Sequence, residues 1–133
     1  MSAERAVYLD SSAIVKLVVQ EPETAALRRY LRRRRTLITS ALARTEVLRA
    51  LLPLGRPAEQ RALDVLSRLE LARVNDRVLT DAGRLKPDTL RSLDAIHLAT
   101  ALQLGADLAR IVTYDARMVA GARRLKIAVA TPR

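Results

Sequence analysis

The chain has 133 residues, no cysteine and a formal net charge of +10, from 24 Lys and Arg against 14 Asp and Glu. This length is enough for a hydrophobic core, and we expect one domain over 1–133. The lack of cysteine excludes disulfides and thiolate metal sites. The surplus of positive charge favours an anionic partner, either nucleic acid or an acidic protein, because cations that neutralise phosphates release counterions.

The scarcity of aromatic residues and of long apolar runs disfavours some classes of protein. Its aromatic residues are three tyrosines, Tyr8, Tyr30 and Tyr114, too few for a platform that stacks bases. No run of about eighteen apolar residues is present, and the first residues do not resemble a secretory signal. We therefore expect a cytoplasmic protein with no membrane partner.

The predicted elements alternate along the chain. Short apolar runs typical of strands cover 7–9, 36–39, 71–74 and 110–113, with a fifth candidate at 127–130. Patterns typical of helices cover 22–31, 41–52, 57–69, 76–83 and 92–104.

Several details of these helices can be predicted as well. Thr39 or Ser40 is a candidate cap for the helix at 41–52, and Asp76 for the helix at 76–83. The helix at 57–69 carries its apolar stripe on Leu63, Leu66 and Leu69.

Strands that alternate with helices favour parallel pairing through right-handed crossovers. The expected fold class is therefore α/β: a single α/β/α sandwich with a central, mainly parallel sheet of four to five strands. We find no internal repeat, low-complexity linker or domain boundary.

Four acidic residues lie where a sheet of this kind gathers side chains. Asp10 ends the first strand, Glu46 interrupts the helix after the second, Asp94 stands at the start of the most apolar helix, and Asp115 follows the fourth strand. The carboxyl ends of parallel strands meet at one edge, where open α/β sheets bind ligands. Carboxylates brought together there repel one another, and a divalent cation with hard oxygen ligands, Mg²⁺ or Mn²⁺, resolves the conflict.

Each of these acids has a structural alternative. Asp10 and Asp115 could cap the helices that follow them, and Asp94 could be a first-turn acid favoured by the helix dipole. Glu46 could pair with Arg49 at i+3. Four such coincidences at one edge of the sheet are less probable than any single one, so we favour the metal site.

Three other polar residues accompany the acids. His97 lies one turn after Asp94, and a lone histidine in an apolar helix is more often a hydrogen-bonded core residue than a catalytic base. Ser11 and Thr113 each stand beside a key acid. Their hydroxyls could bond turns and caps, or could hold a metal ligand in position.

The motifs Y-L-D-S-S-A-I-V-K-L, T-E-V-L, L-D-A-I-H-L-A-T-A-L and V-T-Y-D-A-R resemble, in this order, those of the PIN-domain ribonucleases. Within that family they resemble the VapC toxins of type II toxin–antitoxin systems. The resemblance implies Mg²⁺-dependent endonucleolytic cleavage of RNA that leaves 5′-phosphate and 3′-hydroxyl ends. It maps the family's four acids onto Asp10, Glu46, Asp94 and Asp115.

The resemblance also implies roles and partners. Asp10 and Asp94 would be the principal metal ligands, Asp115 would complete the cluster, and Glu46 would hold a water molecule or accept its proton. A homodimer and a cognate antitoxin that silences the enzyme are expected. The rival hypothesis is a catalytically silent PIN-like module that binds nucleic acid or protein.

The RNA-binding residues are not identified by the sequence. One candidate is the basic cluster of Arg28, Arg29 and the run at 32–35, which could line the route to the acids. The alternative is a solvated helix end, where cations also suit the dipole.

Overall fold

The structure, a computed structural model, describes residues 4–34 and 36–133. Five strands form one sheet in the order β3-β2-β1-β4-β5, and all four neighbouring pairs are parallel. The strands are β1 (Ala6–Leu9), β2 (Leu37–Ser40), β3 (Glu70–Ala72), β4 (Leu108–Val112) and β5 (Val129–Ala130). The predicted α/β sandwich with a parallel sheet is confirmed.

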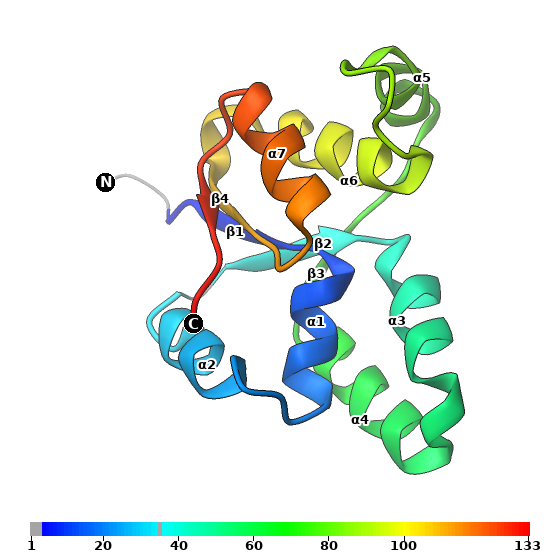
Figure 1. Cartoon of the computed structure of the whole chain (residues 1–133), viewed down its shortest axis with the longest axis vertical. Coiled ribbons are helices and arrows are strands. Elements are labelled where there is room, and N and C mark those ends of the chain that lie inside the picture. The colour runs from blue at the N-terminus through cyan, green and yellow to red at the C-terminus, as the bar shows by residue number, and fades with distance from the viewer. Residues whose placement is uncertain (1–3, 35) are drawn as a thin grey trace.

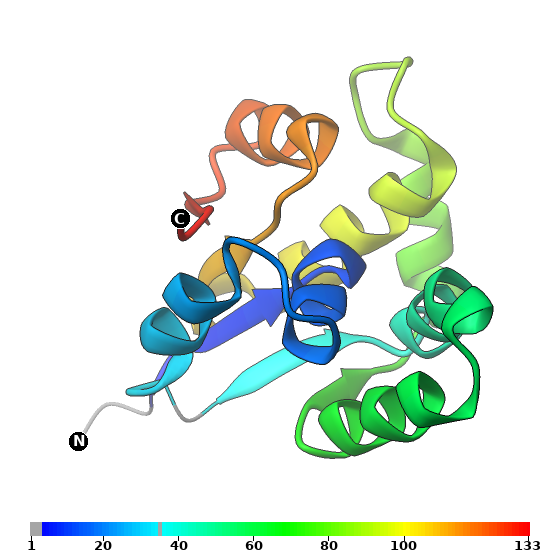
Figure 2. The ribbon, with the colours of Figure 1, turned by 60° about the horizontal axis from the view of Figure 1, so that its bottom comes forward.

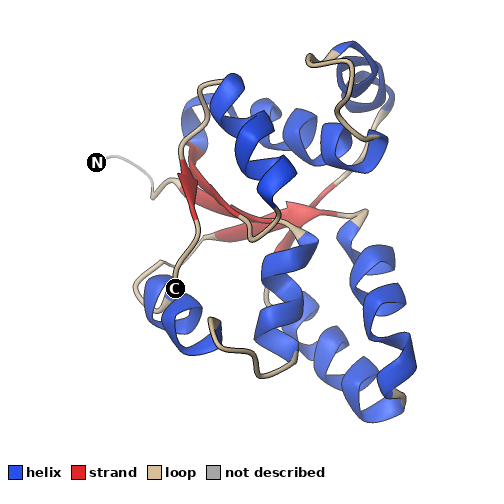
Figure 3. Ribbon diagram, viewed as in Figure 1, coloured by secondary structure: helices blue, strands red, loops and turns tan. Residues whose placement is uncertain are grey.

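The helices cover the sheet on both faces (Figures 1, 2 and 3). On one face lie α1 (Ser11–Val18), α2 (Thr24–Leu31), α3 (Ala43–Leu51) and α4 (Arg56–Ser67). On the other lie α6 (Ser92–Gln103) and α7 (Ala116–Arg124), with α5 (Asp76–Arg84) packed against α6. Two single 3₁₀ turns, η1 (Leu52–Leu54) and η2 (Gly105–Asp107), complete the described elements.

The central strand β1 divides the core into two parts. Because successive side chains of a strand point to opposite faces, Val7 and Leu9 pack with α1 to α4, while Ala6 and Tyr8 pack with α6 and α7. All four residues are buried. Two-sided burial explains why this strand is a continuous apolar run, and it gives the residue that follows it a rigid base.

Of the two expected caps, one is replaced by a neighbouring residue and the other is not formed. Asn75, rather than Asp76, caps α5, and its Oδ1 accepts a hydrogen bond from the Val78 N–H at 2.9 Å. The α3 helix begins at Ala43 with no side-chain cap. The candidate cap Thr39 lies within β2 instead, where its hydroxyl donates to the Leu9 carbonyl at 2.6 Å.

The apolar stripe of α4 also differs from the prediction. Leu63 is 38% exposed, and the buried residues of the helix are Ala58, Ala62 and Leu66. Leu69 is buried, but it lies beyond the end of the helix. Small alanine side chains therefore let α4 pack closely on the rest of its layer. Among the described residues, the helices are all too short or too polar to cross a membrane.

Candidate active site

Asp10 directly follows the central strand and is 4% exposed. It caps α1, because its Oδ1 accepts hydrogen bonds from the Ala13 N–H at 3.1 Å and the Ser12 hydroxyl at 2.6 Å. Its Oδ2 accepts a hydrogen bond of 2.5 Å from the Thr113 hydroxyl. Burial raises the pKa of Asp10, and these hydrogen bonds oppose the rise. Asp10 is therefore a helix cap, as the structural alternative expected. It also lies at the edge of the sheet where the other acids lie.

Two hydroxyls join the end of β1 to the segment after β4. The Ser12 Oγ that donates to Asp10 also accepts from the Tyr114 N–H at 2.9 Å. The Thr113 Oγ1 accepts from the Asp115 N–H at 3.1 Å while it donates to Asp10. Thr113 therefore touches both acids. The part played by Ser12 was not predicted, although its position two residues after Asp10 is a spacing that commonly gives such local bonds.

Glu46 projects from the first turn of α3. Its Oε1 accepts hydrogen bonds from the Ser11 hydroxyl at 2.6 Å and from His97 Nε2 at 2.5 Å. Burial opposes ionisation of this carboxyl, yet the bonds from His97 and Ser11 hold the pKa of Glu46 below its ordinary value. Among the described residues, Glu46 bonds His97 and no ion pair joins it to Arg49, so the expected alternative of an i+3 pair is wrong.

His97 lies in the core and is 2% exposed. Its Nδ1 is 2.6 Å from the hydroxyl of Tyr8, a residue with no exposed surface. Because burial raises the pKa of Tyr8 far above its ordinary value, that hydroxyl stays protonated. With the Tyr8 hydroxyl donating to Nδ1, the Nε2–H of the imidazole donates to Glu46. The core position expected for His97 is confirmed, and its contact with Glu46 is an addition.

Asp94 and Asp115 complete the group. Asp115 caps α7, with its Oδ1 accepting from the Arg117 N–H at 2.8 Å. Asp94 is half-buried in the first turn of α6. Burial raises the pKa of Asp94, and the charge of Asp115 raises it further. The charges of Asp10 and Glu46 act on Asp94 in the same direction, so the four predicted acids share one electrostatic environment.

The chemistry of the four acids suits a hard divalent cation, but their side chains are not arranged to bind one. All four donors are carboxylates, and Asp10 and Asp94 have raised pKa values, which a bound cation would lower. Across residues 4–34 and 36–133, no three Asp, Glu or His side chains are grouped closely enough to hold a metal ion. Oxygens of Asp10, Glu46 and Asp115 bond protein donors instead. Binding of a cation therefore requires some of these side chains to turn.

The basic cluster that includes Arg28 lies away from the acids. The described part of the run at 32–35 leads into the amino end of β2, whereas the acids lie at the carboxyl ends of the strands (Figure 1). The Arg34 guanidinium stacks on the Tyr30 ring at 3.7 Å. Arg35 lies outside the described residues. The cluster therefore lies at the edge of the sheet opposite the acids, and this position agrees with the alternative of a solvated helix end.

Comparisons with known proteins agree with this architecture. The model of the PIN domain family matches residues 7–124. Ribonuclease VapC46 of Mycobacterium tuberculosis is 58% identical over 127 residues, which are 96% of this chain and 98% of that relative. Ribonuclease VapC47 of the same species is 39% identical over 95% of this chain and 96% of its own length.

Solved structures with the same fold are more distant in sequence. A toxin–antitoxin complex from Klebsiella pneumoniae aligns with a TM-score of 0.73 at 21% identity, over 96% of this chain and 98% of that chain. The Sarcin-Ricin loop cleaving toxin VapC20 of Mycobacterium tuberculosis aligns with a TM-score of 0.71 at 17% identity, over 86% and 93%. That all of 1–133 forms one domain stays a prediction. The chain belongs to the PIN-domain family and, within it, to the VapC proteins.

Proposed function

We propose that this protein is a metal-dependent endoribonuclease of the VapC toxin type, with its catalytic site at Asp10, Glu46, Asp94 and Asp115. The observation that carries the proposal is the position of the four acids at the carboxyl edge of the sheet. There Thr113 bonds both Asp10 and Asp115, and the charges of the other three acids raise the pKa of Asp94. The names of the relatives support ribonuclease activity.

The four acids have distinct parts in this proposal. Asp10 and Asp94 are the principal ligands of Mg²⁺, or of Mn²⁺, and Asp115 completes the set. The bound cation would stabilise the negative charge that builds up on the phosphate and lower the pKa of water. Glu46 holds the attacking water or accepts its proton, a role that requires the ionised form. Its lowered pKa supports that role.

The remaining polar residues position these acids. Thr113 and Ser12 fix the two oxygens of Asp10, while Ser11 and His97 fix Oε1 of Glu46. Such bonds set the orientation of a ligand or a base before the substrate arrives.

Partners follow from the same proposal. We propose an RNA substrate, a cognate antitoxin and a homodimer, in the cytoplasm. Solved toxin–antitoxin complexes with this fold support the antitoxin. A catalytically silent PIN-like module remains the competing function, and it predicts binding without cleavage.

Cleavage of total cellular RNA with Mg²⁺, with EDTA as the control, tests the proposal. Asp94→Asn should abolish the cleavage. Asp88→Asn is the matched control, because Asp88 is exposed and pairs with Lys86. Full activity of Asp94→Asn, or no cleavage by the wild-type protein, would contradict the proposal. Sequencing the new RNA ends would identify the cleaved bonds, and an equal rate on DNA would change the substrate class.

A further inference from the structure

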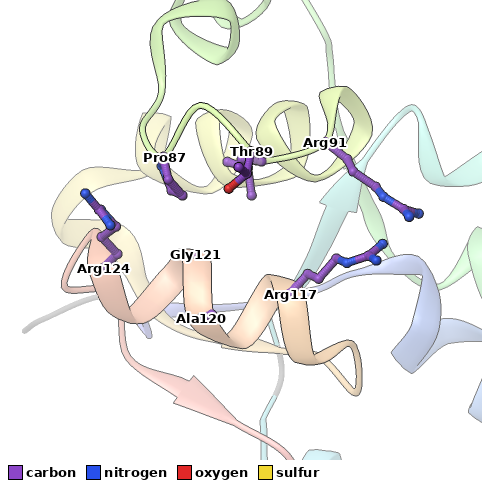
Figure 4. A pocket seen from close by; sticks show the side chains of 8 residues that line it. Pro87, Thr89, Arg91, Arg117, Ala120, Gly121 and Arg124 are labelled. Atoms are coloured by element: carbon purple, nitrogen blue, oxygen red, sulfur yellow. The ribbon is translucent and has the colours of Figure 1, made fainter.

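A pocket of about 640 Å³ opens between α7 and the segment that leads into α6. Figure 4 shows three arginines around it: Arg91 on the α6 side, and Arg117 and Arg124 on α7. Between them the pocket is lined by small or apolar residues, among them Leu90, Ala120 and Gly121. This is therefore an apolar hollow with a cationic rim.

The floor of the pocket is held by close packing. Gly121 is buried, and a Cβ at this position would lie 2.9 Å from Leu98 Cδ1 and 3.3 Å from Leu90 Cδ1. Only a glycine lets α7 approach α6 and Leu90 so closely without a shift of these leucines. The arginines thus stand on a well-packed base, which fixes the spacing of their backbones.

The charge of the rim is not neutralised by neighbouring carboxylates. None of the described residues that line the pocket is acidic. By contrast, two exposed arginines of the described chain, Arg68 and Arg77, pair with acids one turn away. The ion pairs found in the described part of the chain include none of Arg91, Arg117 and Arg124. Three unpaired guanidinium groups around one hollow create a positive potential suited to phosphate.

Two of the pocket arginines lie next to two of the acids in the sequence. Arg91 is three residues before Asp94, and Arg117 is two residues after Asp115. The side chains of Arg91 and Arg117 extend toward the same end of the pocket, and Arg124 stands at the opposite end (Figure 4). Arg117 and Arg124 are seven residues apart on one face of α7, about 10 Å along the helix axis. The cations therefore form a track that leads away from the acids.

We infer that this pocket binds the sugar–phosphate backbone of the RNA beside the bond to be cleaved, with Arg91, Arg117 and Arg124 contacting its phosphates. The inference rests on the proposed function, in which the acids cleave RNA. A strand with its scissile phosphate at Asp94 and Asp115 must place neighbouring phosphates near Arg91 and Arg117, and this favours RNA over an acidic protein segment. Besides its arginines, the described lining of the pocket holds Thr89 as its one polar side chain, so the pocket recognises the backbone rather than the bases.

The test measures binding of a fluorescent single-stranded RNA in EDTA, where cleavage is not required, across a series of salt concentrations. The pocket variant replaces Arg91, Arg117 and Arg124 by Gln. The control variant replaces Arg29, Arg32 and Arg33 by Gln, which removes the same charge from exposed positions at the other edge of the sheet.

Each lost phosphate contact lowers the slope of log affinity against log salt by about 0.7 for a single strand, so the pocket variant should lose about 2 in slope. Between 50 and 200 mM salt, the wild-type affinity should then fall roughly twentyfold more than that of the pocket variant. The control variant should keep most of the wild-type slope, and the melting temperatures should match.

Equal slopes for the two variants, or no RNA binding by the wild-type protein, would overturn the inference. A pocket variant that binds RNA normally but no longer binds an acidic peptide would also overturn it, in favour of a protein partner. These outcomes are separate from the cleavage assay. If wild-type protein cleaves RNA while the two variants bind alike, the pocket assignment fails and the proposed function stands.

Discussion

His97 Nε2 lies 2.5 Å from Glu46 Oε1, and the same imidazole bonds the hydroxyl of Tyr8 through Nδ1 at 2.6 Å. Tyr8, a buried residue of the central strand, therefore helps to orient Glu46 on α3 through the imidazole of His97. The ring of Tyr8 also meets that of His97 edge to face, with centroids 5.8 Å apart. The position of Glu46 is therefore set by the core rather than by its own helix alone.

Replacing His97 by Gln should lower the cleavage rate about 10- to 100-fold, the usual cost of losing a residue that orients a catalytic group. Without the bond from His97, the pKa of Glu46 should rise, because that bond lowers it. The acid limb of the pH–rate profile should then move to higher pH. Tyr8→Phe, which keeps the ring but loses the hydroxyl, should give a smaller change in the same direction. A lower rate with an unmoved acid limb would assign His97 a packing role only.

The two serines after Asp10 should differ in their effect on stability. Ser11→Ala removes a bond to Glu46 and should slow cleavage about tenfold with little change in melting temperature. Ser12→Ala removes the link between Asp10 and the Tyr114 N–H, and should destabilise the fold by about 1 kcal/mol. Thermal melting and cleavage assays on both variants check this. Equal loss of stability in the two variants would contradict the division.

The edge of the sheet at which the four acids lie could be predicted from the sequence, because it depends on topology. Once the strands are parallel, a residue that follows a strand, such as Asp10 or Asp115, lies at one known edge. Which donors reach these acids depends on the rotation of helices about their axes. The bond between His97 and Glu46 spans 51 residues and two helices, and no local pattern encodes it.

Among the basic residues, the most conspicuous sequence feature is not the one nearest the acids. The run at 32–35 is conspicuous in the sequence, yet its described residues, Arg32 to Arg34, precede β2 at the edge of the sheet opposite the acids. Arg91 and Arg117 are 26 residues apart and form no run. Their closeness to Asp94 and Asp115 in the sequence was the available signal. A search for cations within three residues of the predicted acids would have found both.

Asp10→Asn should raise the melting temperature of the metal-free protein at neutral pH while abolishing cleavage. Burial raises the pKa of Asp10, so the ionised carboxylate is disfavoured in the folded state. Asn removes that charge, remains a good N-cap and can still accept from the Ala13 N–H. Wild-type protein at 100 times the Mg²⁺ dissociation constant should gain about 2.7 kcal/mol, and the variant much less. Differential scanning fluorimetry with and without Mg²⁺ measures both effects, and an equal gain in the variant would remove Asp10 from the ligand set.

The pH dependence of stability should depend on the cation. The folded-state pKa values of Asp10 and Asp94 are raised above the ordinary value of 3.8, so the folded state holds their protons more tightly than the unfolded state. Their contribution to stability is therefore greatest below the ordinary pKa and is lost as pH rises through the folded values.

Glu46, whose pKa is lowered, contributes with the opposite sign, gaining stability as pH rises through its own range. In EDTA, the Asp94→Asn variant should lose less stability than wild type when the pH is raised from 4 to 7. Mg²⁺ should reduce the wild-type loss, because a cation favours the ionised carboxylates. Urea unfolding at several pH values, with and without Mg²⁺, measures these slopes. Identical curves in EDTA and Mg²⁺ would mean that these acids do not bind the cation.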